Sequence, residues 1–273
     1  MLVRTVAGIL LVPAYLGILV FFPVSAMSVA FSVLLMVAVY ELLRATGVIQ
    51  RNRCVVVFAM IAAACVPLLF RLGWGELGLR IALMGLTCAL FLVGILSYGR
   101  KSELKVEDIL YALLGGIMIP AFFSALIQIR MMENGRYLVL IPVVSSVLTD
   151  VGAYFVGVLF GRHKGITKVS PNKSAEGFIG GIVAGGLFML AYGMLLRHCF
   201  SVSVHMPHMA IYGLLGSVVT MLGDLAFSLI KRQHGIKDYG HLIPGHGGIL
   251  DRFDSLIFTA PVAYIMIRLL PAL

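Results

Sequence analysis

Long apolar runs alternate with short polar loops along almost the whole chain. A helix that crosses a bilayer needs about 20 predominantly apolar residues. Because backbone polar groups in lipid must pair within their own segment, each run of this length predicts a transmembrane helix. The predicted fold class is therefore all-α, a polytopic integral membrane bundle of about nine transmembrane helices. The expected spans are 4–22, 26–44, 54–71, 79–98, 109–128, 137–160, 177–197, 209–230 and 254–270, with only Pro23 dividing the first two.

Composition agrees with this interpretation and narrows the choice of partners. The chain has 273 residues, of which 60% are hydrophobic and 12% are charged, and its mean hydropathy is +1.04. Soluble domains carry about 25% charged residues, so the length reflects spans in a lipid bilayer rather than soluble domains. The net charge of +9 does not predict nucleic acid as a partner, because the basic residues are scattered over short loops beside apolar runs.

Lys and Arg residues are distributed unevenly between the two sides of the expected bundle. Fifteen lie in the N-terminus and in 44–53, 99–108, 161–176 and 231–253, and six lie on the other side. The richer side is expected to be cytoplasmic. This places the N-terminus inside, the C-terminus outside, and both long polar loops in the cytoplasm.

The stretch from Asp224 to Asp254 departs from the apolar pattern. Asp224, Ser228 and Lys231 are spaced i, i+4, i+7 and form one stripe if this segment is helical. Asp251 and Asp254 are spaced i, i+3 and share a face if the last helix begins just before them. Three carboxylates in one place repel each other unless a cation lies between them. Oxygen-only ligands of this kind suit a hard cation such as Mg²⁺.

Spacing alone leaves two interpretations of this charged stretch open. One is a structural cluster of salt bridges, in which Lys231, Arg232 and Arg252 neutralise the aspartates. The other is a site for phosphoryl or nucleotidyl transfer, in which basic side chains neutralise phosphates beside a metal ion. Glycine favours the second, because its backbone N–H can approach an anion closely. These glycines are Gly235, Gly240, Gly245, Gly247 and Gly248. His246 is positioned to contact a phosphate or a base, whereas His234 is expected to be a solvated loop residue, as is His241.

Acidic residues inside apolar spans are costly and usually face a partner, a cavity or an ion. Asp150 lies deep in the sixth expected span. Glu41 lies near the cytoplasmic end of the second, where a pairing with Arg44 is expected. Small residues recur from 177 to 186, including Gly181 and Gly185, and predict close helix packing. A homodimer formed through this glycine-rich face is the alternative.

The other polar loop covers residues 160–177 and ends just before the seventh expected span. Ser174 and Glu176 are suited to cap that helix. The loop lysines at 164, 168 and 173 have two open interpretations. They are either the ordinary basic residues of a cytoplasmic loop or part of a phosphate cradle at a helix N-terminus.

Residues 228–254 read S-L-I-K-R, four residues, K-D-Y-G, one residue, and then L-I-P-G-H-G-G-I-L-D-R-F-D. This stretch resembles the signature of the phosphatidate cytidylyltransferases, also called CDP-diglyceride synthases, over its whole length. Upstream, D-x-x-A-Y-F-V-G-x-x-F-G-R-H-K from Asp150 and S-P-N-K-S-x-E-G from Ser170 resemble the family's other cytoplasmic motif. The family typically has threonine where Ser174 stands. The resemblance covers the chain from about residue 145 onward, and the first 130 residues match only as apolar spans.

The resemblance implies transfer of CMP from CTP to phosphatidic acid, giving CDP-diacylglycerol and pyrophosphate, with Mg²⁺ and a monovalent cation such as K⁺. The implied catalytic residues are Asp224, Lys231, Arg232, Asp251 and Asp254. The implied metal site consists of Asp224, Ser228, Asp251 and Asp254. The expected contacts of CTP or the lipid phosphate are Ser170, Asn172, Lys173, Ser174, Lys237, His246, Gly247, Gly248 and Arg252.

The same interpretation divides the chain into two functional parts. Residues 1–130 are expected to be scaffold helices, and residues 131–273 are expected to be catalytic helices with their cytoplasmic loops. Because CTP is in water and phosphatidic acid is in lipid, the site is expected at the cytoplasmic surface of a bacterial inner membrane.

Two other kinds of function remain as alternatives. A related CTP-dependent lipid cytidylyltransferase or a polyprenol kinase would differ mainly in its lipid substrate. A cation-coupled transporter would use Asp150 and Asp224 as an ion pathway, although transporters usually bind near the bilayer midplane. The CDP-alcohol phosphotransferase pattern, DGxxAR followed by GxxxDxxxD, does not occur in this sequence.

Overall fold

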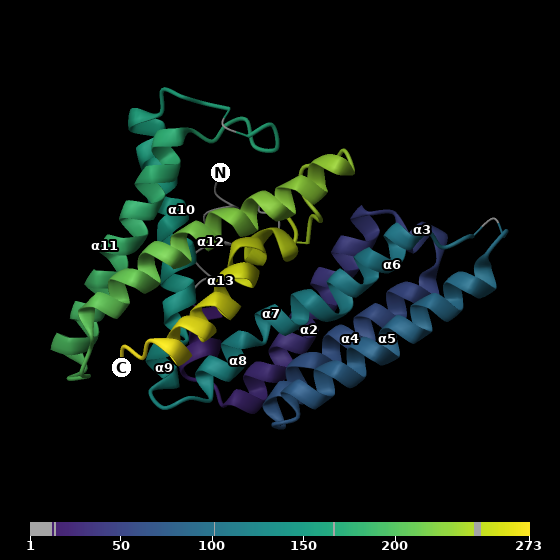
Figure 1. The fold of residues 1–273 in the computed structure, drawn as a ribbon, viewed down its shortest axis with the longest axis horizontal. Coiled ribbons are helices and arrows are strands. Elements are labelled where there is room, and N and C mark those ends of the chain that lie inside the picture. Colours follow the sequence, from purple (N-terminus) through teal and green to yellow (C-terminus); the bar gives the residue numbers. More distant parts are fainter. Residues whose placement is uncertain (1–12, 14, 101, 166, 243–246) are drawn as a thin grey trace. The chain divides into compact units, whose positions relative to one another are not determined.

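A computed structural model describes residues 13, 15–100, 102–165, 167–242 and 247–273, and these residues form helices joined by loops (Figure 1). Its helical elements are α2 (Val24–Ala45), α3 (Val48–Arg51), α4 (Arg53–Arg71), α5 (Gly75–Ser97), α6 (Val106–Leu113), the π-helical turn η1 (Leu114–Met118), α7 (Ile119–Phe123), α8 (Ala125–Arg130), α9 (Gly135–Leu138), α10 (Leu140–Phe160), α11 (Ala175–Cys199), α12 (Met206–Gln233) and α13 (Leu250–Leu269).

The predicted class, a polytopic helical membrane protein, is confirmed. Seven helical segments among the described residues are long and apolar enough to cross a membrane, and they match seven predicted spans to within a few residues at each end. Most of the first expected span, 4–22, lies outside the described residues. The last expected span corresponds to α13, which has 20 residues and is not one of the seven. Its four charged side chains are Asp251, Arg252, Asp254 and Arg268.

The fifth expected span, 109–128, is not one regular helix. Its backbone runs through α6, η1, α7 and α8, and the π-helical turn η1 comes just before Pro120. Proline has no N–H to donate to the carbonyl four residues earlier, so a widened turn is a common accommodation. Two glycines in η1 also permit close packing, because a Cβ on Gly116 would lie 3.1 Å from the Cα of Ala59.

The chain divides into two compact units, each assembled from segments far apart in the sequence. The first unit comprises Met1–Gln128 and Gln233–Phe253, and the second comprises Ile129–Arg232 and Asp254–Leu273. The functional division at residue 130 stays a prediction, since compactness does not report which residues take part in chemistry.

Aromatic side chains from distant segments meet in the core of the first unit. The ring of Phe123 packs edge-on against Phe31 at a centroid distance of 4.7 Å and against Phe253 at 5.4 Å. The ring of Tyr15 also packs against Phe253, at a centroid distance of 5.2 Å. Each such pair adds to the free energy gained by burial, by about 0.5–1.5 kcal/mol. The start of α13 therefore packs against α7, which in turn packs against α2 in the same unit.

Polar contacts in the first unit join loops that the Lys and Arg distribution placed on one side. Arg51 at the end of α3 forms an ion pair with the buried Asp108 of α6. His234 Nε2 lies 2.9 Å from the hydroxyl of Tyr111, and the two rings pack edge-on at 5.2 Å. The prediction that His234 is a solvated loop residue is therefore wrong. The grouping of 44–53, 99–108 and the residues after α12 at one end is confirmed within this unit.

Glycines hold the helices of the second unit close together, as the small residues at 177–186 predicted. A Cβ on Gly152 of α10 would collide with Ala184 of α11, and one on Gly181 would lie 3.0 Å from the Cβ of Ala153. Against α12, a Cβ on Gly213 would lie 2.6 Å from the carbonyl oxygen of Gly185 of α11. Close packing is thus confirmed, and the homodimer stays a prediction.

A Gly213→Ala substitution tests this packing directly. The added methyl group would meet backbone atoms of α11, which cannot rotate away, so we expect a loss of stability of about 1–3 kcal/mol. Thermal unfolding in detergent, followed by circular dichroism, would show a lower midpoint. Gly85→Ala is the matched control, because a Cβ at Gly85 has no neighbour within 4 Å. Equal midpoints for the two variants would contradict the packing described.

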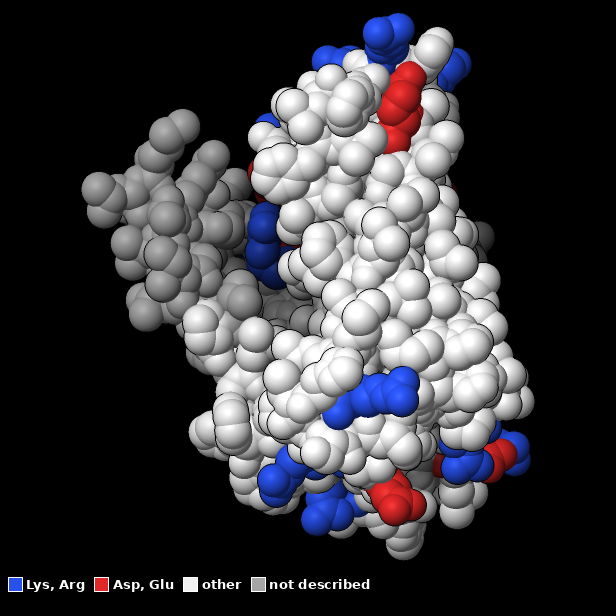
Figure 2. All heavy atoms as spheres, turned by 90° about the vertical axis from the view of Figure 1, so that its left-hand side faces the viewer, with Lys and Arg blue, Asp and Glu red and all other residues white. Residues whose placement is uncertain are grey.

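Charged side chains on the α10–α11 face lie mainly at its ends. Figure 2 shows a broad band of uncharged side chains there, with Lys, Arg, Asp and Glu gathered mostly above and below it. Val151, Ile179, Val183 and Leu187 are among the exposed apolar side chains of these two helices. An exposed apolar band bounded by charges is what a lipid-facing surface requires.

Candidate functional site

An acid–lysine cluster lies in the second unit, where α10, α12, α13 and the loop before α11 meet. Asp224 of α12 forms an ion pair with Lys173 of that loop. The buried Asp254 of α13 has its Oδ2 atom 3.9 Å from Nζ of Lys231, which is also buried. Asp150 of α10 accepts a hydrogen bond from the Ser255 side chain and is close enough to Asp224 and Asp254 to repel both. We refer to Asp150, Lys173, Asp224, Lys231 and Asp254 as the acid–lysine cluster.

The loop carrying Lys173 is held in shape by its own backbone. The N–H of Gly165 donates to the carbonyl of Lys173 at 3.1 Å, and the N–H of Ala175 donates to the carbonyl of His163 at 3.0 Å. The predicted cap is confirmed, since Ser174 Oγ accepts a hydrogen bond from the N–H of Gly177 at 3.1 Å. These contacts fix the backbone on both sides of Lys173, so the position of its ammonium group beside Asp224 follows from local structure.

Glu176, in the first turn of α11, fastens the beginning of the same loop. Its carboxylate accepts the N–H of His163 at 3.2 Å, and its Oε1 atom lies 2.5 Å from Nδ1 of that histidine. The carboxylate thus ties the loop to the helix, and its expected role as a cap of α11 stays a prediction. Hydrogen bonds therefore hold both the beginning of the loop, at His163, and the backbone on either side of Lys173.

The predicted stripe on α12 is confirmed as one helical face. Ser228 and Lys231 are buried and Asp224 is half-buried, whereas Arg232 on the neighbouring face is exposed. Nε of Arg232 donates to the backbone carbonyl of Val169 at 3.4 Å. Both basic residues at the end of α12 thus lie at the same end of the second unit as the 161–174 loop.

Asp251 belongs to the first unit and organises the segment before α13. Its Oδ2 atom accepts two backbone hydrogen bonds, from Tyr239 at 2.8 Å and from Gly248 at 3.0 Å. As predicted, α13 begins just before it, so Asp251 and Asp254 both lie in the first turns of this helix. Asp238 is a close neighbour, because a Cβ on Gly247 would lie 3.2 Å from Asp251 and 3.5 Å from Asp238.

Glu41 of α2 has a different partner from the one expected. Its carboxylate is buried and accepts hydrogen bonds from the N–H groups of Leu250, at 2.9 Å, and Ile249. The predicted pairing with Arg44 is therefore wrong. The reason is that the start of α13 supplies unpaired backbone donors in the same unit.

The glycines of the signature make room for an anionic group, and in the structure this group is a side-chain carboxylate of the protein itself. A Cβ on Gly240 would lie 2.5 Å from Oε1 of Glu41, and a Cβ on Gly248 would lie 2.5 Å from Oε2. The nearby backbone N–H groups donate to Glu41 and Asp251. Close approach of backbone to a carboxylate thus accounts for both glycines, and direct contact of Gly247 or Gly248 with a phosphate stays a prediction.

Several residues expected to bind substrate are exposed in the structure. Lys237, Arg252 and Asn172 are exposed, and Ser170 is half-buried beside Thr167, whose Oγ1 accepts its N–H at 3.3 Å. His246 and Gly245 lie outside the described residues. The roles of all these residues as substrate contacts stay predictions.

The chemistry of the acid–lysine cluster fits a hard divalent cation. Its anionic donors are all carboxylate oxygens, and cationic lysines already lie against two of them. Across the described residues, however, no three His, Cys, Asp or Glu side chains form a ready metal-binding group. Asp224, Ser228, Asp251 and Asp254 as ligands, and Mg²⁺ and K⁺ as cofactors, therefore stay predictions.

Together, the fold and the acid–lysine cluster define a class of protein: a polytopic helical membrane protein with clustered aspartates and lysines at one end of a helical unit. A model of the cytidylyltransferase family matches residues 2–270. The chain belongs to this family.

Known relatives extend the comparison. A protein of Staphylococcus haemolyticus is 31% identical over 98% of this chain and 99% of its own length. One of Bacillus subtilis is 38% identical over 62% of each chain, and one of Mycobacterium tuberculosis strain H37Rv is 37% identical over 61% of this chain. The last match spans only 49% of the mycobacterial protein. All three relatives are called phosphatidate cytidylyltransferase.

Proposed function

We propose that this protein is a phosphatidate cytidylyltransferase, which transfers CMP from CTP to phosphatidic acid and releases pyrophosphate. The observation that carries the proposal is the ion pair between Lys173 and Asp224. It fixes Lys173 of the S-P-N-K-S-x-E-G motif to α12, one helical turn before the signature begins at Ser228 on the same helix. The relatives' shared name supports the same reaction.

The reaction joins two polyanions, and the charges of the acid–lysine cluster suit this task. An oxygen of the phosphatidate phosphate forms a bond to the α-phosphorus of CTP. The bond from this phosphorus to the oxygen that bridges the α- and β-phosphates breaks, and pyrophosphate leaves with that oxygen. The nucleophile is already an anion, so no strong general base is needed. The main requirement is to position the two phosphates against their mutual repulsion.

Lys173 and Lys231 would supply that positioning and screening. Each ammonium group lies beside an aspartate in the structure, which holds it in place before substrate binds. A phosphate that enters the cluster would take over part of this pairing, since phosphate oxygens are strong acceptors for ammonium donors. Asp224 and Asp254 would hold Mg²⁺, which when bound supplies further neutralisation of the phosphate charge.

The partners and location follow from the same proposal. CTP would come from water, phosphatidic acid would come from the bilayer, and the cluster would face the cytoplasm of a bacterial inner membrane. The basic loops at this end of the second unit support that orientation.

Pyrophosphate release tests the proposed function. Purified protein in detergent would be given CTP, phosphatidic acid and Mg²⁺, each omitted in turn. Release that requires both substrates, with CDP-diacylglycerol as the product, is the expected result. Release with a polyprenol or an archaeal-type lipid but not with phosphatidic acid would assign another lipid substrate, and no release would redirect the assays to transport.

Lys173 and Lys164 allow a matched test of the lysines in the 161–174 loop. Both are basic residues of the same loop, but Lys173 pairs with Asp224 whereas Lys164 is exposed. We expect Lys173→Ala to lower kcat/KM for CTP by about 10- to 100-fold, because one charge-assisted contact to phosphate is lost. Lys164→Ala should stay within about twofold of the natural protein. Equal losses in both variants would mean that the loop contributes only general positive charge.

A further inference from the structure

Glu41 is a buried acid in the span α2, where an acidic side chain is costly unless it has partners. Its side chain is only 5% exposed, and its partners are backbone N–H groups at the start of α13, more than 200 residues later in the chain. Hydrogen bonds to a charged acceptor are stronger than those between neutral groups. The contact is therefore one of the stronger polar links between α2 and α13.

The loop is shaped around this carboxylate. Gly240 and Gly248 approach it so closely that any Cβ would collide with its oxygens at 2.5 Å. The backbone that binds Glu41 also carries the groups that hold Asp251, because Gly248 N–H donates to Asp251 and the next two N–H groups donate to Glu41. One backbone segment thus connects the two carboxylates.

We propose that Glu41 is a positioning residue for the signature, which fixes the segment Gly248–Leu250 and through it the side chain of Asp251. The proposal rests on the proposed function, in which Asp251 belongs to the catalytic group. The aromatic contacts of Phe253 already hold the first residues of α13 in the first unit, so the carboxylate of Glu41 has the narrower effect of setting the conformation of the three residues before Asp251.

Glu41→Gln removes the charge but keeps nearly the same size. Hydrogen exchange of the full-length protein in detergent would report the amides of Ile249 and Leu250. We expect about 5- to 10-fold faster exchange there, the factor that corresponds to replacing a charged acceptor by a neutral one, with little change in distant helices. We also expect kcat for pyrophosphate release to fall at least tenfold at temperatures well below unfolding, with a smaller change in KM for CTP.

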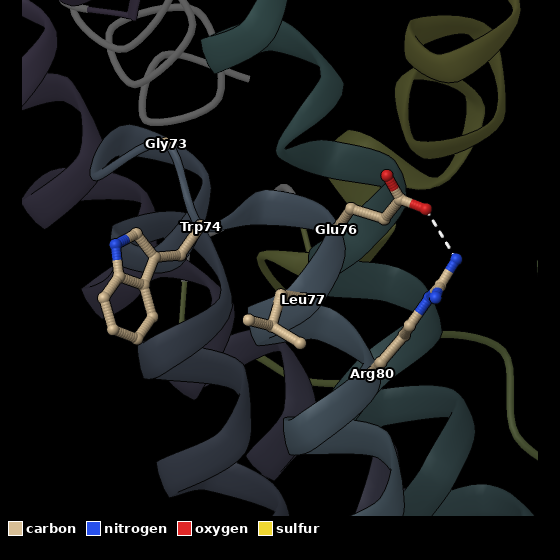
Figure 3. A pocket seen from close by; sticks show the side chains of 5 residues that line it. All are labelled: Gly73, Trp74, Glu76, Leu77 and Arg80. Atoms are coloured by element: carbon tan, nitrogen blue, oxygen red, sulfur yellow. Dashed lines mark hydrogen bonds and ion pairs between the residues drawn. The ribbon is translucent and has the colours of Figure 1, made fainter.

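Glu76→Gln is the matched control for the loss of charge. Glu76 lines a surface pocket of the same unit with Gly73, Trp74, Leu77 and Arg80, and its carboxylate points toward Arg80, 2.5 Å away on the same helix (Figure 3). Both partners are largely exposed, so this exchange of Glu for Gln should leave both activity and hydrogen exchange at 247–256 unchanged.

A double-mutant cycle separates positioning from a general loss of stability. Gly240→Ala should be harmful in the natural protein, because the methyl group meets Glu41, and should add little to Glu41→Ala, where the space is open. Additive effects, unchanged exchange at Ile249 and Leu250, or faster exchange spread evenly over the chain would each overturn the proposal. If the natural protein released no pyrophosphate, the proposed function would fail, and the exchange measurement would still decide the role of Glu41.

Discussion

Asp224→Asn is expected to lower pyrophosphate release by at least about 100-fold while leaving the protein folded. Asparagine has nearly the same size but carries no charge, so the partner of Lys173 and a proposed ligand of the metal ion are lost together. Removal of one preorganised electrostatic group from an active site commonly costs 100- to 1,000-fold in rate. The measurement is initial rate in detergent with CTP, phosphatidic acid and Mg²⁺.

Glu76→Gln is again a suitable control, since it removes an exposed carboxylate distant in sequence from the cluster. Circular dichroism and thermal unfolding would establish that Asp224→Asn is folded. Activity within about twofold of the natural protein would remove Asp224 from the catalytic group. The acid–lysine cluster would then be the structural set of salt bridges that the spacing left open.

Asp251→Asn is expected to abolish turnover while preserving the conformation of the signature, and Asp251→Ala should disturb both. Two backbone donors of Asp251, the N–H groups of Tyr239 and Gly248, bind the same oxygen, Oδ2. The single carbonyl oxygen of asparagine can accept both hydrogen bonds, so the loop should keep its shape while the negative charge is lost. We expect at least about 100-fold slower pyrophosphate release for both variants.

Hydrogen exchange across residues 239–251 distinguishes the two effects, because only Asp251→Ala should expose the amides of Tyr239 and Gly248. The prediction would be contradicted if the Asp251→Asn variant were active while the Asp251→Ala variant was inactive. That result would show that Asp251 acts only by organising the loop, and it would remove this residue from the proposed metal site.

Hydrophobic periodicity, glycine spacing and capping predicted much of the fold because each is a local property. The seven apolar spans, the cap by Ser174 and the close packing along 177–186 depend on residues a few positions apart. The widened turn before Pro120 could have been foreseen from the proline, but not its exact form. The loops grouped by their basic residues do lie together within each unit.

Contacts between distant segments were not predictable in the same way. Nothing near Glu41 in the sequence indicates residues 249 and 250 as its partners, and Arg44 was the obvious local choice. Asp150 was recognised as a costly acid, but its approach to Asp224 and Asp254 depends on how three helices pack. An acid in an apolar span was the available signal in both cases, and it indicated that a partner exists without identifying it.

The boundary between the two compact units falls inside α13, between Phe253 and Asp254. During synthesis, therefore, neither unit can acquire its full set of contacts until the chain has been extended into α13. A nascent chain that stops before Leu250 would lack Phe253 of the aromatic core in the first unit and Asp254 of the acid–lysine cluster in the second unit. A chain that ends before α13 should therefore be treated by quality control in the membrane as incomplete in both units.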